Sequence, residues 1–314
     1  MLLTCLAAPL TAPTDSGSAD LWIISDQCQG KCSSAVPRVP LYSQHALAPA
    51  GRAVRLFYGD SHTGTHAYGP IGTDTVRLGG LAAPGQYLAA ITDTNTSVLD
   101  AGSAGILGLG FPPISIIWRE LVAADVAGSK LPGFGRADAG GSDYGARAFP
   151  SLGFLSGAAP AGPHKRGPEP SPPPSAADSF ATFGPLLARL VTLEMLSRPL
   201  VVAALQRDTL SLGGGHAGTL SLGAMPPGLS EDDLTWVPVR GYKASEGGLP
   251  PPPQAPDEVY PLVWEVPIDD VYFDGAKLPR STLSPPSLPL SALIDTVRPV
   301  IVPVSVLNSL PPPL

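Results

Sequence analysis

Two aspartates, each followed by small or hydroxyl-bearing residues, carry the most definite chemistry in this sequence. Asp15 opens "DSGS", in which Gly17 allows a sharp turn and the Ser18 hydroxyl can donate a hydrogen bond to a carboxylate. Asp295 opens "DTVR" and is followed by the Thr296 hydroxyl. If the fold brings the two carboxyls within hydrogen-bonding distance, they cannot both stay ionised, and the pair would share one proton. The ionised member would then activate a water molecule while the protonated member polarises a carbonyl.

The pattern of two separate aspartates also has a simpler interpretation. Most acidic residues in turns cap a backbone N–H or are solvated, and nothing within "DSGS" alone distinguishes a base from a cap. A weak internal echo, "TDSGSADLW" against "LIDTVRPVIV", favours two similar lobes that each provide one aspartate.

Cysteine and histidine spacings indicate no metal centre. Cys28 and Cys32 flank "QGK", which suits a small disulfide-closed loop or two free thiols, and a disulfide would indicate an oxidising compartment. His62 and His66 lie four apart in a Gly-rich, non-helical stretch without a third ligand. We therefore expect no metal and no cofactor. Residues 95–97, "NTS", form a glycosylation triplet that would suit an exposed loop.

The elements that must position these residues are mostly strands. Short apolar and β-branched runs alternate with Gly, Pro and Asp, which predicts many strands joined by turns. They are "LWIIS", "AVRLFYG", "TDTVRLGG", "QYLAAIT", "TLSLG", "LTWVPV", "VYFDG" and "ALIDTVRPVIVPV". Helical spacing predicts helices over 114–126 and 183–196, the second stopped by Pro199.

Composition limits the partners. The net charge is −7, the 19 Lys and Arg residues are scattered, and no apolar run approaches the roughly 20 residues of a membrane span. We expect no nucleic-acid partner, no membrane and a monomer. The apolar start, "MLLTCLAAPLTAP", has no basic residue and is interrupted by prolines, so it is a poor signal peptide. Residues 159–177 are Pro-rich and predict an exposed insertion.

The order of several motifs resembles that of the pepsin family of aspartic endopeptidases, in particular its secreted fungal members. The chain reads "DSGSADLWIIS", "CQGKC", "FYGDSHTGTHAYGPIGTDTVRLGG" and "AGILGLGFPPIS", then "FGPLLARL", "GTLSLGAMPPGLSEDDLTWVPV", "WEVPIDDVYFDGAKL" and "ALIDTVRP". The resemblance covers most of residues 14 to 310 outside the Pro-rich insertion.

The resemblance implies a role for each matching residue. Asp15 and Asp295 match the catalytic aspartates, and Ser18 and Thr296 the hydroxyls that support them. A flap that closes over substrate would include Tyr58, Gly59 and Asp60, with Trp22 supporting it; ordinary core packing is the alternative for the two aromatics. Residues 106–108, "ILG", match a segment that packs against the first Asp loop.

Four departures from the family pattern stand out. Only a short apolar segment precedes Asp15, and Pro13 should weaken the strand that leads into it. The second site carries Val297 and Arg298 where the family has Gly and a small hydroxyl residue, and a cation there would favour ionised carboxylates. The chain ends soon after its second aspartate, and the two aspartates lie farther apart than is usual. We therefore expect a chain truncated at both ends and degenerate at its second motif.

Together these observations predict a mostly β, bilobal pepsin-like acid protease fold with an incomplete C-terminal lobe. We expect an N-terminal lobe over 14–224 and a C-terminal lobe over 225–314. The predicted function is an aspartic endopeptidase that hydrolyses peptide bonds of peptide or protein substrates at acid pH, in an extracellular or vacuolar location. The alternative is a catalytically inactive homologue that at most binds peptides.

Overall fold

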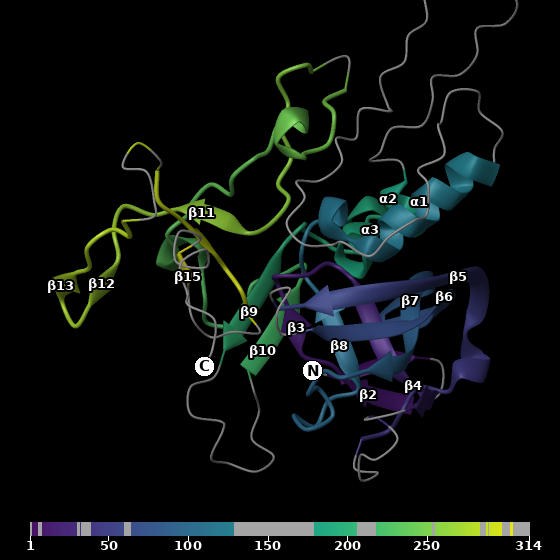
Figure 1. Cartoon of the computed structure of the whole chain (residues 1–314). Coiled ribbons are helices and arrows are strands. Elements are labelled where there is room, and N and C mark those ends of the chain that lie inside the picture. The colour runs from purple at the N-terminus through teal and green to yellow at the C-terminus, as the bar shows by residue number, and fades with distance from the viewer. Residues whose placement is uncertain are drawn as a thin grey trace, which may run out of the picture.

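A computed structural model describes most of the chain and contains one large β-sheet, on the right in Figure 1. The mostly β fold predicted from the sequence is confirmed. The described residues are 2–5, 8–29, 32, 39–59, 64–128, 179–205, 218–252, 255–282, 287, 289–296 and 302–303.

The large sheet has eight strands in the order β2-β1-β6-β7-β4-β8-β3, with β5 paired to β6. Long antiparallel β5, β6 and β7 form a meander, whereas β3 pairs parallel with β8, and β4 parallel with β7. The strands are β1 (Leu2–Cys5), β2 (Ala8–Thr11), β3 (Thr14–Asp15), β4 (Leu21–Gln29), β5 (Ala48–Tyr58), β6 (Thr65–Leu78), β7 (Leu81–Thr94) and β8 (Gly105–Gly108).

A hairpin precedes the first aspartate, contrary to the expectation that only an apolar segment would. Strands β1 and β2 pair with each other, and Leu3 of β1 pairs with Leu78 of β6. The two strands are only four residues each, with a proline in β2, so their pairing depends on the neighbouring edge of β6 rather than on local pattern.

The first half of β4, residues 21–25, is buried on both faces, which explains the apolar run that begins it. Leu21 and Ile23 belong to one hydrophobic cluster, whereas Trp22 and Ile24 belong to a second. Since successive strand residues point to opposite faces, β4 separates two cores, and the residues just before it are held between them.

Three α-helices pack near one side of this sheet (Figure 1). The helix predicted over 114–126 is confirmed as α1 (Ile116–Gly128), but the single helix predicted over 183–196 is wrong. Two short helices, α2 (Phe180–Phe183) and α3 (Leu186–Thr192), flank Gly184 and Pro185 instead. A proline disfavours helical backbone in the residue before it, so the helical pattern breaks at this pair. Among the described residues, no helix is long and apolar enough to span a membrane.

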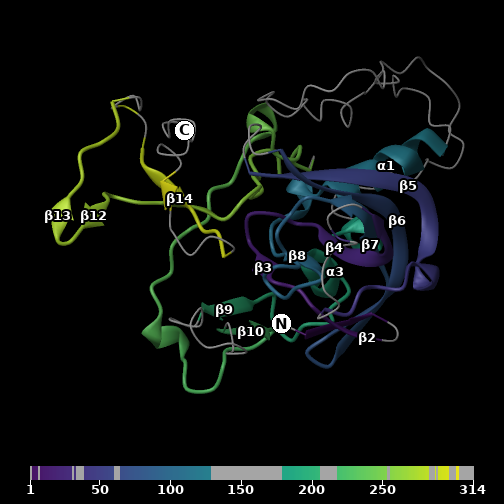
Figure 2. The ribbon, with the colours of Figure 1, turned by 60° about the horizontal axis from the view of Figure 1, so that its bottom comes forward.

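The later part of the chain forms smaller sheets. Strands β12 and β13 project away from the large sheet in both views (Figures 1 and 2). The strand predicted from "LTWVPV" is wrong: residues 234–239 form no strand in the described chain, and Pro238 removes a donor. The strands are β9 (Val201–Leu205), β10 (Gly218–Leu222), β11 (Glu265–Pro267), β12 (Tyr272–Phe273), β13 (Ala276–Lys277), β14 (Ser291–Leu293) and β15 (Val302–Pro303).

Apolar burial is concentrated before residue 224. Leu220 and Leu222 of β10 pack against the cluster that holds Leu21 and Ile23, and no later described residue packs against either cluster. Several large apolar side chains after them are exposed, among them Trp236, Tyr272 and Phe273. Four short 3-10 helices complete the described structure: η2 (Gln44–Ala46), η3 (Pro112–Ile114), η5 (Glu231–Asp233) and η6 (Ala244–Glu246).

Candidate active site

The loop that carries Asp15 is fixed by backbone hydrogen bonds to the segment that begins with β8. Pro13 weakens the entering strand less than expected, because its carbonyl accepts the Leu107 N–H at 3.0 Å. The Asp15 carbonyl accepts the Leu109 N–H at 2.7 Å, and the Ser18 carbonyl accepts the Gly110 N–H at 2.8 Å. The "ILG" segment therefore packs against the first Asp loop, as its resemblance implied.

Gly108 is required by the closeness of this packing. A Cβ at this position would lie 2.3 Å from the carbonyl carbon of Ala19 and 2.5 Å from the backbone nitrogen of Asp20. Both are backbone atoms, which cannot rotate aside as a flexible side chain could. Gly108 therefore lets β8 pack directly against the backbone of the loop that carries Asp15, and this packing fixes where Asp15 lies relative to the core.

The Asp15 carboxylate is almost fully buried and held by two donors. The Ser18 hydroxyl donates to Oδ2 at 2.5 Å, and the Gly17 N–H donates to Oδ1 at 2.8 Å. Burial raises the pKa of Asp15 above its usual value, and the nearby charge of Asp295 adds to the rise, while the two hydrogen bonds oppose it. A carboxyl in this setting keeps a proton to higher pH than a solvated one.

The second aspartate comes to the same place from the end of β14. Thr296 donates its N–H to the Ser16 hydroxyl at 2.9 Å and its own hydroxyl to the Thr14 carbonyl at 2.8 Å. Ser16 returns the contact, since its N–H donates to the Thr296 hydroxyl at 3.1 Å and its hydroxyl to the Ile294 carbonyl at 2.8 Å. These four hydrogen bonds join two loops that are 280 residues apart in sequence.

Gly17 lies between the two carboxyls. A Cβ on Gly17 would be 3.2 Å from Asp15 Oδ1 and 3.3 Å from Asp295 Oδ2. The two oxygens can therefore be no farther apart than the sum of those distances. A side chain here would contact both carboxyls, so the small residue keeps the space between them open to a reactant.

Tyr58 and Trp22 lie together beside this pair. Tyr58 ends β5, in the hairpin that β5 forms with β6, and its hydroxyl accepts a hydrogen bond from the Trp22 indole N–H. Burial raises the pKa of Tyr58 well above its usual value, and the charge of Asp20 adds to this, so the phenol stays neutral. Gly59 follows with a positive φ of 78°, which glycine adopts without strain.

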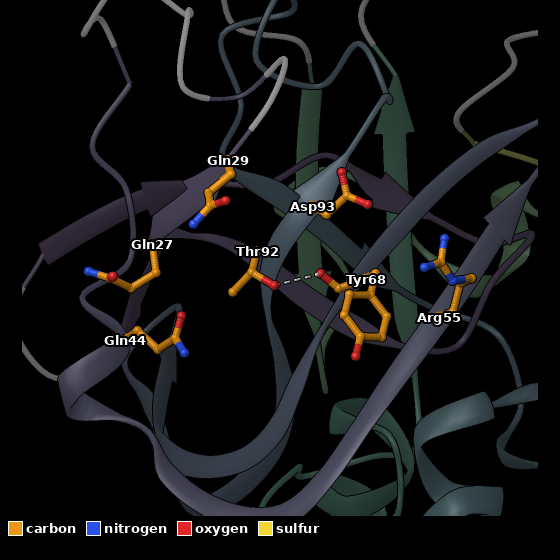
Figure 3. A pocket seen from close by; sticks show the side chains of 7 residues that line it. All are labelled: Gln27, Gln29, Gln44, Arg55, Tyr68, Thr92 and Asp93. Atoms are coloured by element: carbon orange, nitrogen blue, oxygen red, sulfur yellow. Dashed lines mark hydrogen bonds between the residues drawn. The ribbon is translucent and has the colours of Figure 1, made fainter.

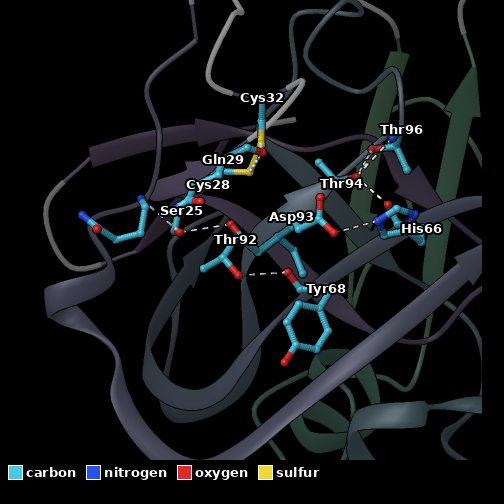
Figure 4. The surroundings of a disulfide bond; sticks show 12 residues. Ser25, Cys28, Gln29, Cys32, His66, Tyr68, Thr92, Asp93, Thr94 and Thr96 are labelled. Carbon is cyan, nitrogen blue, oxygen red and sulfur yellow. Dashed lines mark hydrogen bonds and ion pairs between the residues drawn. A yellow bond between two sulfur atoms is a disulfide. The ribbon is translucent and has the colours of Figure 1, made fainter.

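Three sequence predictions fall outside the described residues. They concern Asp60, Val297 with Arg298 after the second aspartate, and the insertion over 159–177. The predicted pairing of Cys28 with Cys32 is confirmed as a disulfide, whose Cα atoms lie 5.9 Å apart (Figure 4).

Asp20 is a site residue that the sequence pattern did not indicate. Its buried carboxylate accepts hydrogen bonds from the Ser115 hydroxyl at 2.5 Å and from the Ile116 and Ile117 N–H groups at 2.9 and 3.2 Å. It thus caps the N-terminus of α1 and ties the first Asp loop to that helix. Burial raises the pKa of Asp20, against the lowering effect of these hydrogen bonds. Its partners lie about 95 residues away, so no local spacing signals the role.

Ser16 and Trp264 were also missed. Ser16 could have been inferred, because a hydroxyl residue follows the aspartate in both "DS" and "DT". Trp264 precedes β11 and donates its indole N–H to the Leu109 carbonyl at 3.0 Å, while its ring lies 4.5 Å from that of Phe111. It links the β11–β14 sheet to the segment under the first loop.

Glu265, next to Trp264, is buried with polar partners. Burial opposes ionisation, but hydrogen bonds from Ser291, Tyr242 and Arg240 together lower the pKa of Glu265. Arg240 contacts it at 3.2 Å and lies over the Tyr242 ring. Burial and the bond to this carboxylate raise the pKa of Tyr242 to about 12. Glu265 also pairs with Leu293 of β14, the strand that leads to Asp295.

A separate open hollow of about 580 Å³ lies away from the carboxyl pair (Figure 3). Arg55 lies over the Tyr68 ring there, 4.9 Å from its centre. The lining contains neither candidate aspartate, and the chemistry described above is at the loops instead. The hollow is lined by Gln27, Gln29, Gln44, Arg55, Tyr68, Thr92 and Asp93.

Similarity to known proteins coincides with the first loop and its sheet. Residues 9–126 match the family described as eukaryotic aspartyl protease. This part of the chain is therefore similar to aspartyl proteases. Rhizopuspepsin-2 of Rhizopus niveus is 38% identical over 103 residues, 33% of this chain and 25% of the relative. Syncephapepsin of Syncephalastrum racemosum is 36% identical over 118 residues, 38% of this chain and 26% of the relative. Aspergillopepsin-1 of Emericella nidulans is 34% identical over 106 residues.

The chain thus matches about a quarter of the length of each of these aspartyl protease relatives. The family match includes Asp15, Trp22, Tyr58 and the "ILG" segment, whereas Asp295 lies outside it. The first half of the candidate site has support from both similarity and geometry. The second half depends on the contact between the two loops.

Proposed function

We propose that this chain is an aspartic endopeptidase in which Asp15 and Asp295 together activate a water molecule for peptide hydrolysis. The observation that carries the proposal is that both carboxyls approach Gly17. A Cβ placed on Gly17 would lie 3.2 Å from Asp15 Oδ1 and 3.3 Å from Asp295 Oδ2. The aspartyl protease family of residues 9–126 supports the same chemistry. Peptide or protein chains are then the substrates.

The site geometry gives each group a defined part in this reaction. The proposed chemistry needs one proton shared between the two carboxyls. The ionised member accepts a proton from water, the protonated member donates to the peptide carbonyl oxygen, and a tetrahedral diol forms without a covalent intermediate. Ser18 and the Gly17 N–H orient Asp15, and the four bonds between Ser16 and the 294–296 segment keep the carboxyls together.

Tyr58 serves in this proposal as the flap residue that covers bound substrate. Its hydroxyl is held by the Trp22 indole and hydrogen bonds with the Ser18 side chain. The flap hairpin is thereby connected to the Asp15 loop, and closing it would shield the carboxyls from bulk water.

We also propose two lobes, 14–224 and 225–314, with the carboxyl pair between them. Leu222 is the last described residue packed against the large hydrophobic cluster that holds Leu21 and Ile23, which supports this boundary. An extracellular or vacuolar location is proposed from the Cys28–Cys32 disulfide, since disulfides persist in oxidising compartments. We propose that the chain acts as a monomer.

The test is cleavage of an unfolded protein substrate at about pH 3 to 5, where such a pair holds one proton, with and without a statine-type inhibitor. We expect inhibitor-sensitive cleavage that Asp15→Asn and Asp295→Asn each abolish. Asp257→Asn, which changes an exposed aspartate elsewhere, is the matched control and should cleave normally. Folded wild-type protein without inhibitor-sensitive cleavage would remove the proposal.

One observation favours a second candidate, a peptide-binding homologue without activity. A side chain at Gly17 would contact both carboxyls, and the second loop carries Val297 at the corresponding position and Arg298 after it. If the wild-type chain binds the statine peptide without cleaving substrate, and Val297→Gly with Arg298→Thr restores cleavage, the second motif is the cause. Equal activity in the wild-type and doubly changed chains contradicts this alternative.

A further inference from the structure

The carboxamide of Asn95 holds the start of β6, at the turn end of the hairpin that β5 and β6 form. Its Oδ1 accepts the His66 N–H at 2.7 Å, and its Nδ2 donates to the Gly64 carbonyl at 2.9 Å. Strand pairing between β6 and β7 ends at Ala67 and Thr94, so the Asn95 side chain extends the ladder beyond the last paired residues. We call Asn95 and its two side-chain bonds to β6 and Gly64 the carboxamide clamp.

Neighbouring bonds fix the clamp in place. The His66 carbonyl accepts hydrogen bonds from the Thr94 hydroxyl at 2.6 Å and from the Asn95 N–H at 3.3 Å. His66 Nε2 lies 3.0 Å from Asp93 Oδ2, and the Thr94 and Thr96 hydroxyls are 2.9 Å apart (Figure 4). On its other edge the same stretch pairs with β5, where Tyr58 lies opposite Thr65. The clamp thus acts on the strand that faces Tyr58.

The same Asn95 is the acceptor position of the glycosylation triplet 95–97. Oδ1 and Nδ2 of Asn95 both bond to residues 64–66. Residues 64–66 therefore lie along the edge of the carboxamide formed by Oδ1 and the amide hydrogen cis to it. An N-linked sugar converts the side chain into a secondary amide. In the favoured trans form of this amide, the first carbon of the sugar takes the position of the hydrogen cis to Oδ1.

We propose that Asn95 is a positioning residue of the flap hairpin, and that the clamp and a glycan at Asn95 exclude each other. A sugar on Nδ2 would stand where Gly64 and His66 now lie. The carboxamide would have to turn away, and both side-chain bonds to the hairpin would be lost. The triplet therefore serves the folded chain through its amide and not as a glycan carrier.

Hydrogen exchange of residues 64–67 tests the clamp in the full chain made in a host without N-glycosylation. Ser97→Ala destroys the triplet but keeps the clamp, so its exchange should match the wild type. Asn95→Ala removes both bonds and should speed exchange of the His66 amide by about tenfold, as expected for one lost hydrogen bond. Asn95→Asp keeps an acceptor for His66 but no donor for Gly64, and should fall between them. Equal exchange in Asn95→Ala and Ser97→Ala overturns the proposal.

Exclusion of the glycan is tested with wild-type chain from a glycosylating secretory host. We expect folded protein without sugar at Asn95, or a glycosylated fraction whose 64–67 exchange matches Asn95→Ala. A glycosylated fraction with wild-type exchange overturns the exclusion. Enzymatic removal of the sugar is avoided as a control because it leaves aspartate at position 95.

The consequence for catalysis rests on the proposed function. If the hairpin covers substrate, Asn95→Ala should raise KM more than it lowers kcat, and Ser97→Ala should change neither. Exchange and glycan occupancy do not depend on activity, so failure of the clamp and failure of the peptidase proposal are distinguishable.

Discussion

Replacing Thr296 by valine tests whether the two aspartate loops are joined as described. Valine keeps the shape of threonine but has no hydroxyl. The change removes the hydrogen bond from the Ser16 N–H, at 3.1 Å, and the one to the Thr14 carbonyl, at 2.8 Å. Ser16→Ala removes the other two bonds of the same contact, to the Ile294 carbonyl and from the Thr296 N–H.

The expected loss follows from the number of bonds. A net contribution of about 1 kcal/mol for each hydrogen bond gives about 2 kcal/mol for Thr296→Val, roughly a thirtyfold fall in the folding equilibrium constant. Ser16→Ala should cost a similar amount. Because both changes act on one contact, the double variant should lose less than the sum of the two.

Urea denaturation gives the free energies of unfolding, and hydrogen exchange of residues 289–296 reports local release of the second loop. Thr296→Ser keeps the hydroxyl and should stay near the wild type. Thr92→Val is the matched control, because it loses one exposed bond of 3.4 Å on β7. If Thr296→Val behaves like Thr296→Ser, or if the two losses simply add, the reasoning about the joined loops is refuted.

Three further changes test other parts of the structure. Gly108→Ala puts a methyl group 2.3 Å from the Ala19 carbonyl carbon. Thermal unfolding should show a free energy of unfolding lower by about 1 to 3 kcal/mol, as overpacking causes. An unchanged melting temperature would show that the loop can move aside. Because burial raises the pKa of Asp20, its stabilising effect is complete below the ordinary pKa of 3.8 for an aspartate and is lost as pH rises through the higher pKa of the folded state. Asp20→Asn should therefore flatten the decline of the unfolding free energy from acid to neutral pH, and an unaltered pH profile would contradict the assignment. Breaking the disulfide with Cys28→Ser and Cys32→Ser should cost about 2 kcal/mol, as expected for so short a loop, measured by urea denaturation with the reduced wild type for comparison.

Local patterns were enough to predict the parts of the fold that depend on neighbouring residues. The continuous apolar run of β4 predicted a strand, and helical spacing predicted α1. Predictions failed where a single residue or a distant partner decided the outcome. Pro185 divided the expected helix over 183–196, and the β1–β2 hairpin depends on pairing with β6.

The sequence by itself determined the chemistry that is available: two aspartates, the hydroxyls beside them, a glycine at the turn and a cysteine pair four residues apart. Those features follow from residue type and short spacing. Tertiary structure alone decided that Ser16 meets Thr296 across 280 residues, that Asp20 caps a helix 95 residues away, and that Asn95 bonds to the start of β6. A hydrogen bond needs its donor and acceptor about 3 Å apart, and no periodicity in the sequence records which distant residues the packed sheets bring to that distance.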